Sequence, residues 1–251
     1  MDVFKPARAN GMGVIFIVSG GWFSSHEGIN PDLAKPFNDR GITVFEVVHG
    51  SQPRYHIDEI AVQLKRAIKF IRANAHTYGI EPNEIGVTGA SAGGHLSLLL
   101  AGAVDKGDPN AADPINRVGS EVQSVVAFFP PTDFLNWGKP DYQPFDVPVM
   151  QIFIPAFGIK KDATKDDIKK LAVLLSPITY VTPQFPPTLI FHGDKDPLVP
   201  IQQSQTMDAA LAKAGVQHLF VTVPGLGHDP AMIAQKMGDM VSWFEKTLKK
   251  S

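Results

Sequence analysis

A serine stands between small residues in the pentapeptide Gly89-Ala90-Ser91-Ala92-Gly93. An apolar segment at 85–88 precedes the pentapeptide and a longer one at 94–101 follows it, which predicts a strand, a tight turn and a buried helix. Such a turn strains the serine backbone, and small neighbours let strand and helix approach each other. The pentapeptide alone is expected by chance in roughly one chain in ten of this length. The flanking elements therefore carry the prediction that Ser91 is a nucleophile.

Two later loops offer the partners that a nucleophilic serine needs. A serine hydroxyl attacks well only when a base takes its proton, and a third group must orient that base. Asp194 and Asp196 follow an apolar segment at 187–192, and His228 follows another at 217–223. Asp196 lies further into its loop, so we assign it as the acid, with His228 as the base. The alternative is that both aspartates are turn or N-cap residues.

Acyl transfer also needs N–H donors that stabilise the oxyanion of the tetrahedral intermediate. One predicted donor is the backbone N–H of Ala92, the residue after the serine. The loop Ser19-Gly20-Gly21-Trp22 follows an apolar segment at 13–18, and its glycines allow close approach of the backbone to a substrate. We therefore predict that Gly21 and Trp22 supply the other donors. The alternative is a plain glycine turn.

The elements that must position these residues alternate between strands and helices. Predicted strands lie at 13–18, 42–48, 85–88, 124–129, 187–192 and 217–223, with a possible stub at 2–4. Predicted helices lie at 31–40, 57–78, 94–101, 201–214 and 231–249. This alternation predicts an α/β fold with a mostly parallel sheet and helices on both faces. We expect residues 1–251 to form one domain.

Residues 131–186 interrupt the alternation. The segment is rich in proline and aromatic residues, has a charged part at 160–170, and is too long for a connecting loop. We interpret it as an inserted lid or cap. Its charges are typical of a solvated helix face. Its aromatic residues either pack the lid onto the body or line a pocket, and the sequence does not choose between these.

Composition excludes several functions. The net charge of −2 comes without a basic patch, which argues against a nucleic-acid partner, and no apolar run is long enough to span a bilayer. The chain has no cysteine, so thiolate catalysis and cysteine-ligated metals are excluded. No cofactor is expected. No metal is expected either, because His26-Glu27 and His56-x-Asp58 lack a third ligand at suitable spacing. No signal-peptide pattern begins the chain, so we expect a cytoplasmic protein, or a secreted one whose upstream sequence was removed.

The chain resembles the α/β-hydrolase superfamily, and within it the esterase/lipase group that includes acetyl esterases, acetylxylan esterases and feruloyl esterases. The motifs that carry the resemblance are Ser19-Gly20-Gly21-Trp22, Gly89-Ala90-Ser91-Ala92-Gly93-Gly94-His95-Leu96, His192-Gly193-Asp194-Lys195-Asp196 and Gly227-His228. The resemblance implies the same nucleophile, acid and base, in the order Ser, Asp, His. Two features depart from the group. Ser19 and Trp22 replace a histidine and a glycine of its His-Gly-Gly-Gly motif, which makes Trp22 a candidate wall of the acyl pocket, and the N-terminal hairpin is almost missing.

These residues predict a serine carboxylic-ester hydrolase that works through an acyl-enzyme. Its expected substrates are small-molecule or saccharide-linked esters of short-chain acyl groups or aromatic acids, such as acetyl or feruloyl esters. One alternative is a serine peptidase resembling the catalytic domain of prolyl oligopeptidases, although the large gating domain of those enzymes is absent. The other is a hydrolase fold that binds a ligand without catalysis. The sequence leaves the natural ester and the oligomeric state open.

Overall fold

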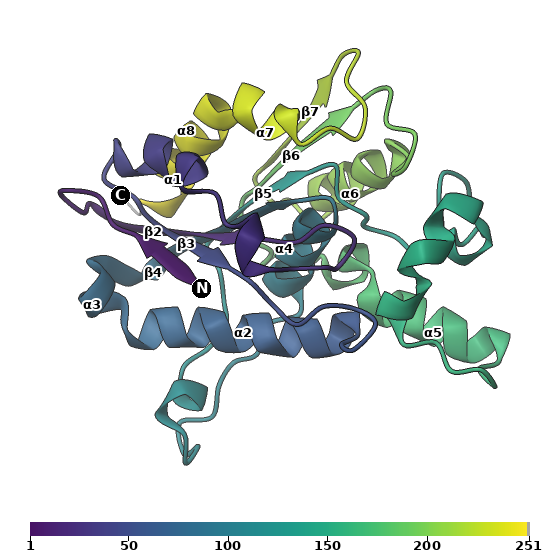
Figure 1. Cartoon of the computed structure of the whole chain (residues 1–251), viewed down its shortest axis with the longest axis horizontal. Coiled ribbons are helices and arrows are strands. Elements are labelled where there is room, and N and C mark those ends of the chain that lie inside the picture. Colours follow the sequence, from purple (N-terminus) through teal and green to yellow (C-terminus); the bar gives the residue numbers. More distant parts are fainter. Residues whose placement is uncertain (250–251) are drawn as a thin grey trace.

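The computed structural model describes residues 1–249. Its centre is a seven-stranded sheet with the order β1-β3-β2-β4-β5-β6-β7, seen nearly edge-on in Figure 1. The strands are β1 (Asp2–Phe4), β2 (Gly11–Ile17), β3 (Thr43–Val47), β4 (Ile80–Ala90), β5 (Ser124–Phe128), β6 (Thr188–Gly193) and β7 (His218–Val223). All neighbouring strands are parallel except β1, which pairs antiparallel with β3. The predicted α/β fold, its six strands and the stub are thus confirmed.

Helices cover both faces of the sheet. One face carries α1 (Pro31–Asn38), α7 (Ala231–Gln235) and α8 (Met237–Leu248), and the other carries α2 (Ile57–Ala73), α3 (Ala75–Tyr78), α4 (Ala92–Gly102) and α6 (Gln202–Lys213) (Figure 1). Short 3-10 helices lie at His26–Gly28 and Pro114–Arg117. Each face has its own apolar core. Every residue of α4 except its last is buried, because this helix is enclosed between the sheet and the elements around it. Within residues 1–249, no helix has the length and apolar character needed to cross a membrane.

Two helices that the sequence predicts as continuous are divided. The predicted helix at 57–78 breaks at Asn74, whose backbone leaves the helical region and whose side-chain amide, like its backbone N–H, donates to the Phe70 carbonyl oxygen. The predicted helix at 231–249 breaks at Lys236, which leaves the helical region of backbone conformation. Met232 before the break and Met240 after it are both fully buried. Tertiary packing therefore overrides the periodicity there.

The segment 131–186 contains no strand and joins β5 to β6. It forms three 3-10 helices, Pro144–Asp146, Pro148–Phe157 and Pro177–Tyr180, and helix α5 (Lys165–Leu175), which lies at one side of the molecule in Figure 1. Phe134, Trp137 and Phe157 are buried and belong to the core cluster of the α2 and α4 face. These three aromatic residues therefore pack the segment onto the body, which is one of the two roles that the sequence leaves open.

Candidate active site

The predicted nucleophile occupies a strained turn between β4 and α4. Ser91 has φ 53° and ψ −118°, a conformation that side-chain-bearing residues rarely adopt. The turn depends on glycine at both ends of the pentapeptide. A Cβ on Gly89 would lie 2.6 Å from the carbonyl carbon of Gly93, and one on Gly93 would lie 2.8 Å from the carbonyl oxygen of Ile17. The backbone thus holds the Ser91 side chain at the carboxyl end of the sheet.

The structure brings Ser91, Asp196 and His228 together, although they follow three different strands. His228 Nε2 lies 2.8 Å from Ser91 Oγ, and His228 Nδ1 lies 2.8 Å from Asp196 Oδ2. A carboxylate accepts hydrogen bonds, so Nδ1 carries the ring proton and Nε2 is free to accept the proton of the serine hydroxyl. This is the arrangement that general-base activation of a serine requires.

The Asp196 side chain has no exposed surface and is held from several sides. Its Oδ1 accepts hydrogen bonds from the Leu198 and Val199 amides, each 2.9 Å long. Burial by itself raises the pKa of this carboxyl, but hydrogen bonds from His192, His228 and the Val199 amide together hold that pKa well below its usual range. Asp196 therefore stays an anion beside His228 at neutral pH.

The neighbouring groups in this loop have different roles. Asp194 lies in the turn and accepts a hydrogen bond from the Gly225 amide at 2.7 Å, which fits the predicted turn role. His192 Nε2 lies 3.3 Å from Asp196 Oδ2 and 3.0 Å from the Val199 carbonyl oxygen. Ser204 donates to the other ring nitrogen of His192 at 2.7 Å. His192 thus orients Asp196. The one sequence feature that could have indicated this contact is that His192 lies four residues before Asp196.

The loop with the predicted oxyanion donors is a tight turn. Gly20 and Phe23 exchange two backbone hydrogen bonds, and between them Gly21 and Trp22 have φ 56° and 61°. Gln52 donates to both carbonyl oxygens of the turn. Its side-chain amide donates to the Gly21 carbonyl oxygen, and its backbone N–H donates to the Trp22 carbonyl oxygen. Within residues 1–249 the amides of Gly21 and Trp22 have no acceptor. Two backbone N–H groups in this turn are therefore free to bind an anion.

The third predicted donor, the Ala92 amide, belongs to the first turn of α4. Amides in the first turn of a helix have no carbonyl partner within the helix, and they lie at the positive end of the helix dipole. In the described part of the chain, the Ala92 amide has no acceptor outside the helix either. It directly follows Ser91, so it lies beside the predicted nucleophile.

The Trp22 side chain does not wall the cavity beside the serine, contrary to the sequence-based expectation. It is 2% exposed and packs against the rings of His95, Phe134 and Phe157. Its indole N–H donates to His95 Nδ1 at 3.2 Å, and His95 Nε2 donates to the Leu175 carbonyl oxygen at 2.8 Å. Burial lowers the pKa of His95 to about 4, so the ring is neutral and can accept from Trp22. This network anchors the predicted oxyanion loop in the core.

A second polar contact fastens the start of the same loop. Ser19 donates to His49 Nε2 at 2.9 Å, and His49 Nδ1 donates to the Gly50 carbonyl oxygen at 2.7 Å. Burial lowers the pKa of His49, which favours the neutral ring that this contact needs. Ser19 with His49 thus occupies the place of the missing motif histidine. The sequence does not reveal the pair because it joins two loops thirty residues apart.

A cavity of about 550 Å³ lies beside the serine turn. Its lining includes Ser19 and Gly20 from the predicted oxyanion loop, Ala90 immediately before the serine, and Pro230 just after the histidine. No aromatic residue of the 131–186 segment lines it. The cavity therefore adjoins the candidate active site on the side of α1 and α7.

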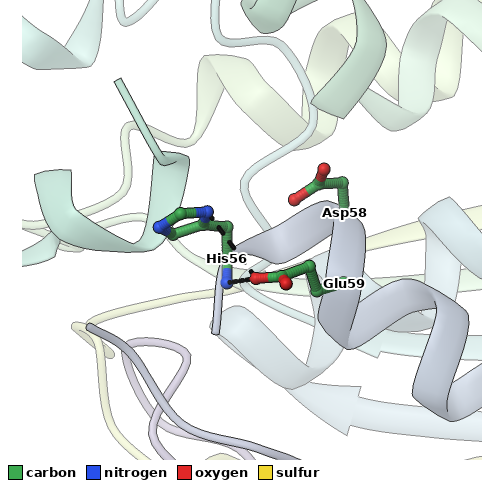
Figure 2. A group of neighbouring side chains, drawn as sticks. All are labelled: His56, Asp58 and Glu59. Carbon is green, nitrogen blue, oxygen red and sulfur yellow. Dashed lines mark hydrogen bonds and ion pairs between the residues drawn. The ribbon is translucent and has the colours of Figure 1, made fainter. Parts of the chain in front are cut away.

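One group of possible metal ligands lies apart from this site. His56, Asp58 and Glu59 at the start of α2 bring their ligand atoms within 4.8 Å of one another, as Figure 2 shows. The expectation that His56-x-Asp58 lacks a third ligand group is therefore wrong, since Glu59 is next in sequence. However, a Glu59 carboxylate oxygen already accepts from the His56 amide at 2.9 Å (Figure 2), which is a helix-capping contact. The cluster thus has a structural explanation.

Comparisons with known proteins place the chain among esterases. A family model described as BD-FAE matches residues 1–211. Esterase LipQ of Mycobacterium tuberculosis is 30% identical over 195 residues, which cover 77% of this chain and 44% of that protein. The chain spans about half the length of the curated relatives it matches.

Solved structures extend the likeness to nearly the whole chain. A truncated carbohydrate esterase from gut microbiota is 26% identical with a TM-score of 0.82, covering 99% of this chain and 90% of that one. The acetyl ester-xyloside bifunctional hydrolase from Caldicellulosiruptor lactoaceticus is 25% identical with a TM-score of 0.78, covering 97% and 85%.

Proposed function

The chain belongs to the BD-FAE family within the esterase group of α/β-hydrolases, and from that premise we propose that it is a serine carboxylic-ester hydrolase. The observation that carries the proposal is the continuous hydrogen-bond chain from Ser91 through His228 to Asp196, with 2.8 Å at each step. A binding protein would have no need for a strained serine aligned on a histidine and a buried carboxylate.

In the first half of the proposed reaction, Ser91 Oγ attacks the ester carbonyl carbon while His228 Nε2 takes the hydroxyl proton. The carbonyl oxygen becomes an oxyanion, which the free amides of Gly21, Trp22 and Ala92 stabilise. The C–O bond to the alcohol then breaks, and His228 gives its proton to the departing alkoxide. An alcohol is released and Ser91 carries the acyl group.

In the second half, a water molecule attacks the acyl-enzyme while His228 takes one of its protons. The intermediate collapses, the bond to Ser91 Oγ breaks, and the same proton returns to the serine. An acid is released and the enzyme is restored. Asp196 stays ionised throughout, keeps His228 in the correct tautomer, and stabilises the imidazolium that forms in each half.

We propose short-chain acyl or aromatic acid esters, free or linked to saccharides, as the substrates. The solved relatives include an acetyl ester-xyloside hydrolase and a carbohydrate esterase, which supports an acetyl ester. The cavity of about 550 Å³ is of the size of a small-ligand pocket and would also admit larger groups. The same proposal makes the segment 131–186 a lid, because its Phe153 and Phe157 pack against Trp22 of the oxyanion loop.

The test is the hydrolysis of p-nitrophenyl esters from acetate to palmitate, with methyl ferulate and acetylated xylan alongside. We expect Ser91→Ala to abolish every activity that the wild type has. The control is Ser124→Ala, which removes a buried serine whose hydroxyl bonds to Thr247, far from the site.

Two other results would redirect the proposal. Reaction of Ser91 with a fluorophosphonate probe without hydrolysis of any ester would indicate another acyl-transfer substrate, such as a peptide. A protein that neither hydrolyses these esters nor reacts with the probe would be a hydrolase fold that only binds a ligand. A Ser91→Ala variant that keeps most of its activity would refute the mechanism.

A further inference from the structure

A buried carboxylate among the residues that line the cavity has an oxygen without a partner. Glu46 belongs to β3, is 0% exposed, and is one of the residues that line the cavity. Its Oε2 accepts a hydrogen bond from the backbone N–H of Asn30 at 2.7 Å. Among residues 1–249, its buried Oε1 has no hydrogen-bond partner. The triad and the predicted oxyanion loop do not use this group.

Leaving a carboxylate oxygen unpaired in a buried place is unfavourable. Burial raises the pKa of Glu46, and the Asn30 amide only partly offsets this. Whether ionised or protonated, the carboxyl therefore lacks one hydrogen bond. A hydroxyl group satisfies either form, because it can donate to a carboxylate and accept from a carboxylic acid.

Apolar side chains form much of the rest of the cavity lining, together with Ser19, Ser24, Ser25 and Ser51. Phe16 and Ile17 of β2, Leu33 of α1 and Ile233 of α7 supply its walls. A group bound in the cavity would therefore bury hydrocarbon against these apolar side chains as well as approach the carboxylate. A purely hydrocarbon group would fill the walls and leave Oε1 unpaired.

The sheet register fixes how far Glu46 lies from the nucleophile. Glu46 pairs with Phe16 and Phe16 pairs with Thr88, so Glu46 is two strands away from a residue three places before Ser91. With the usual strand spacing and rise per residue, the backbones of Glu46 and Ser91 are roughly 14 Å apart. Both side chains shorten this span, so a chain of about six atoms can reach from the ester carbonyl to the carboxylate.

We propose that this cavity is the specificity pocket of the enzyme and that Glu46 selects esters whose apolar chain ends in a hydroxyl group. This inference rests on the proposed ester hydrolysis and adds the chemistry of the preferred substrate. The apolar walls bind the chain, and Glu46 Oε1 pairs with the terminal hydroxyl. Ala90, next to Ser91, and Pro230, two residues after His228, both line the pocket, so the experiment tests each side of the ester bond.

The test compares isosteric esters that differ by a hydroxyl in place of a methyl group. On the acyl side the pair is p-nitrophenyl 6-hydroxyhexanoate against p-nitrophenyl heptanoate. On the alcohol side it is 6-hydroxyhexyl acetate against heptyl acetate. In one of the two pairs we expect kcat/KM to favour the hydroxylated ester by roughly ten- to a hundred-fold, because the methyl analogue buries Oε1 without a partner. The pair that discriminates also identifies which half of the ester occupies the pocket.

Two variants assign the preference to Glu46. Glu46→Met has a similar shape but no acceptor, so the ratio of kcat/KM should fall to about one or below. Glu46→Gln keeps an oxygen for the Asn30 amide and offers an N–H to the cavity, so it should fold and keep an intermediate ratio. The ratio within each variant cancels any general loss of activity. Glu84→Met is the matched control, because Glu84 is a partly buried carboxylate near the opposite end of β4 and should keep the wild-type ratio.

The outcomes separate this inference from the proposed function. Equal rates within both pairs, or a preference that persists in Glu46→Met, would overturn the role of Glu46 while ester hydrolysis stands. A stronger preference for the 6-aminohexanoyl ester would also overturn it, in favour of a cation site. If the wild type hydrolyses none of these esters through Ser91, the proposed function fails and the inference fails with it.

Discussion

The buried His95 makes the stability of this protein depend on pH in a defined direction. Both ring nitrogens of His95 are engaged, one accepting from Trp22 and the other donating to Leu175. Burial lowers the pKa of His95 to about 4 in the folded protein, against an ordinary value of 6.5. Between these two values the unfolded chain binds a proton that the folded protein does not. Stability is therefore complete above the ordinary value and is lost as the pH falls toward 4.

The magnitude follows from the separation of the two pKa values. A difference of that size corresponds to about 3 kcal/mol, since each pKa unit is worth about 1.4 kcal/mol. The free energy of unfolding should thus fall by about 2 kcal/mol between pH 7 and pH 5, and by about 3 kcal/mol at pH 4, through His95 alone. For a protein of ordinary stability this is a large fraction of the total.

Urea unfolding of the wild type and of His95→Asn, measured from pH 7 to pH 4, tests this. The asparagine oxygen can still accept from Trp22, but the Leu175 carbonyl loses its donor, so at pH 7 the variant should be less stable by about 1–3 kcal/mol. The variant has no group to protonate there, so the difference should shrink as the pH falls. Trp22 is itself a buried fluorescent reporter of this contact.

The control for other titrating groups is His76→Asn, which replaces an exposed histidine. It should follow the wild-type dependence on pH. If His95→Asn lost stability with falling pH as steeply as the wild type does, the assignment of this dependence to the buried ring would be refuted.

Two further substitutions probe the candidate site. Asp196→Asn should lower kcat for ester hydrolysis by about 10⁴-fold with little change in KM, because a neutral amide no longer enforces the histidine tautomer. Asp194→Asn, in the same loop, should change kcat less than ten-fold. If steady-state assays showed the larger loss of kcat in Asp194→Asn, the assignment of the acid would be reversed. Gly21→Ala should lower kcat by about 10²-fold or more, because the new Cβ at φ 56° would collide with the Phe153 ring and displace the oxyanion amides. Gly238→Ala, which meets no neighbour, should leave kcat unchanged, and a fully active Gly21→Ala would show that this turn does not bind the oxyanion.

Local sequence patterns predicted most of the architecture. Apolar runs located all six main strands, because most of these strands are largely buried; β7, at the edge of the sheet, is only partly buried. The order of the three candidate catalytic residues placed them on loops at one edge of the sheet. The errors occurred where packing decides: the helix breaks at Asn74 and Lys236, and β4, which extends upstream to Ile80 through residues with a turn-like sequence.

The polar contacts between distant segments could not be predicted. His49 and Ser19 meet only after β2 and β3 pair, and Trp22 contacts His95 only when the loop after β2 packs against α4. Glu46 gave a signal, because it is a charged residue within an otherwise apolar strand run. Periodicity alone does not say whether such a residue is exposed at an edge or buried in the lining of a cavity.

The candidate site is assembled from residues that are far apart in the sequence. Ser91 and His228 are separated by 137 residues, and His228 follows the last strand of the sheet. A nascent or partly folded chain can form the serine turn with its neighbouring strands, but it has no base beside it until β7 has joined β6. Under the proposed mechanism, full activity therefore requires that β7 has joined the sheet, and a chain that stops folding short of β7 would keep at most the residual catalysis of a serine without its base.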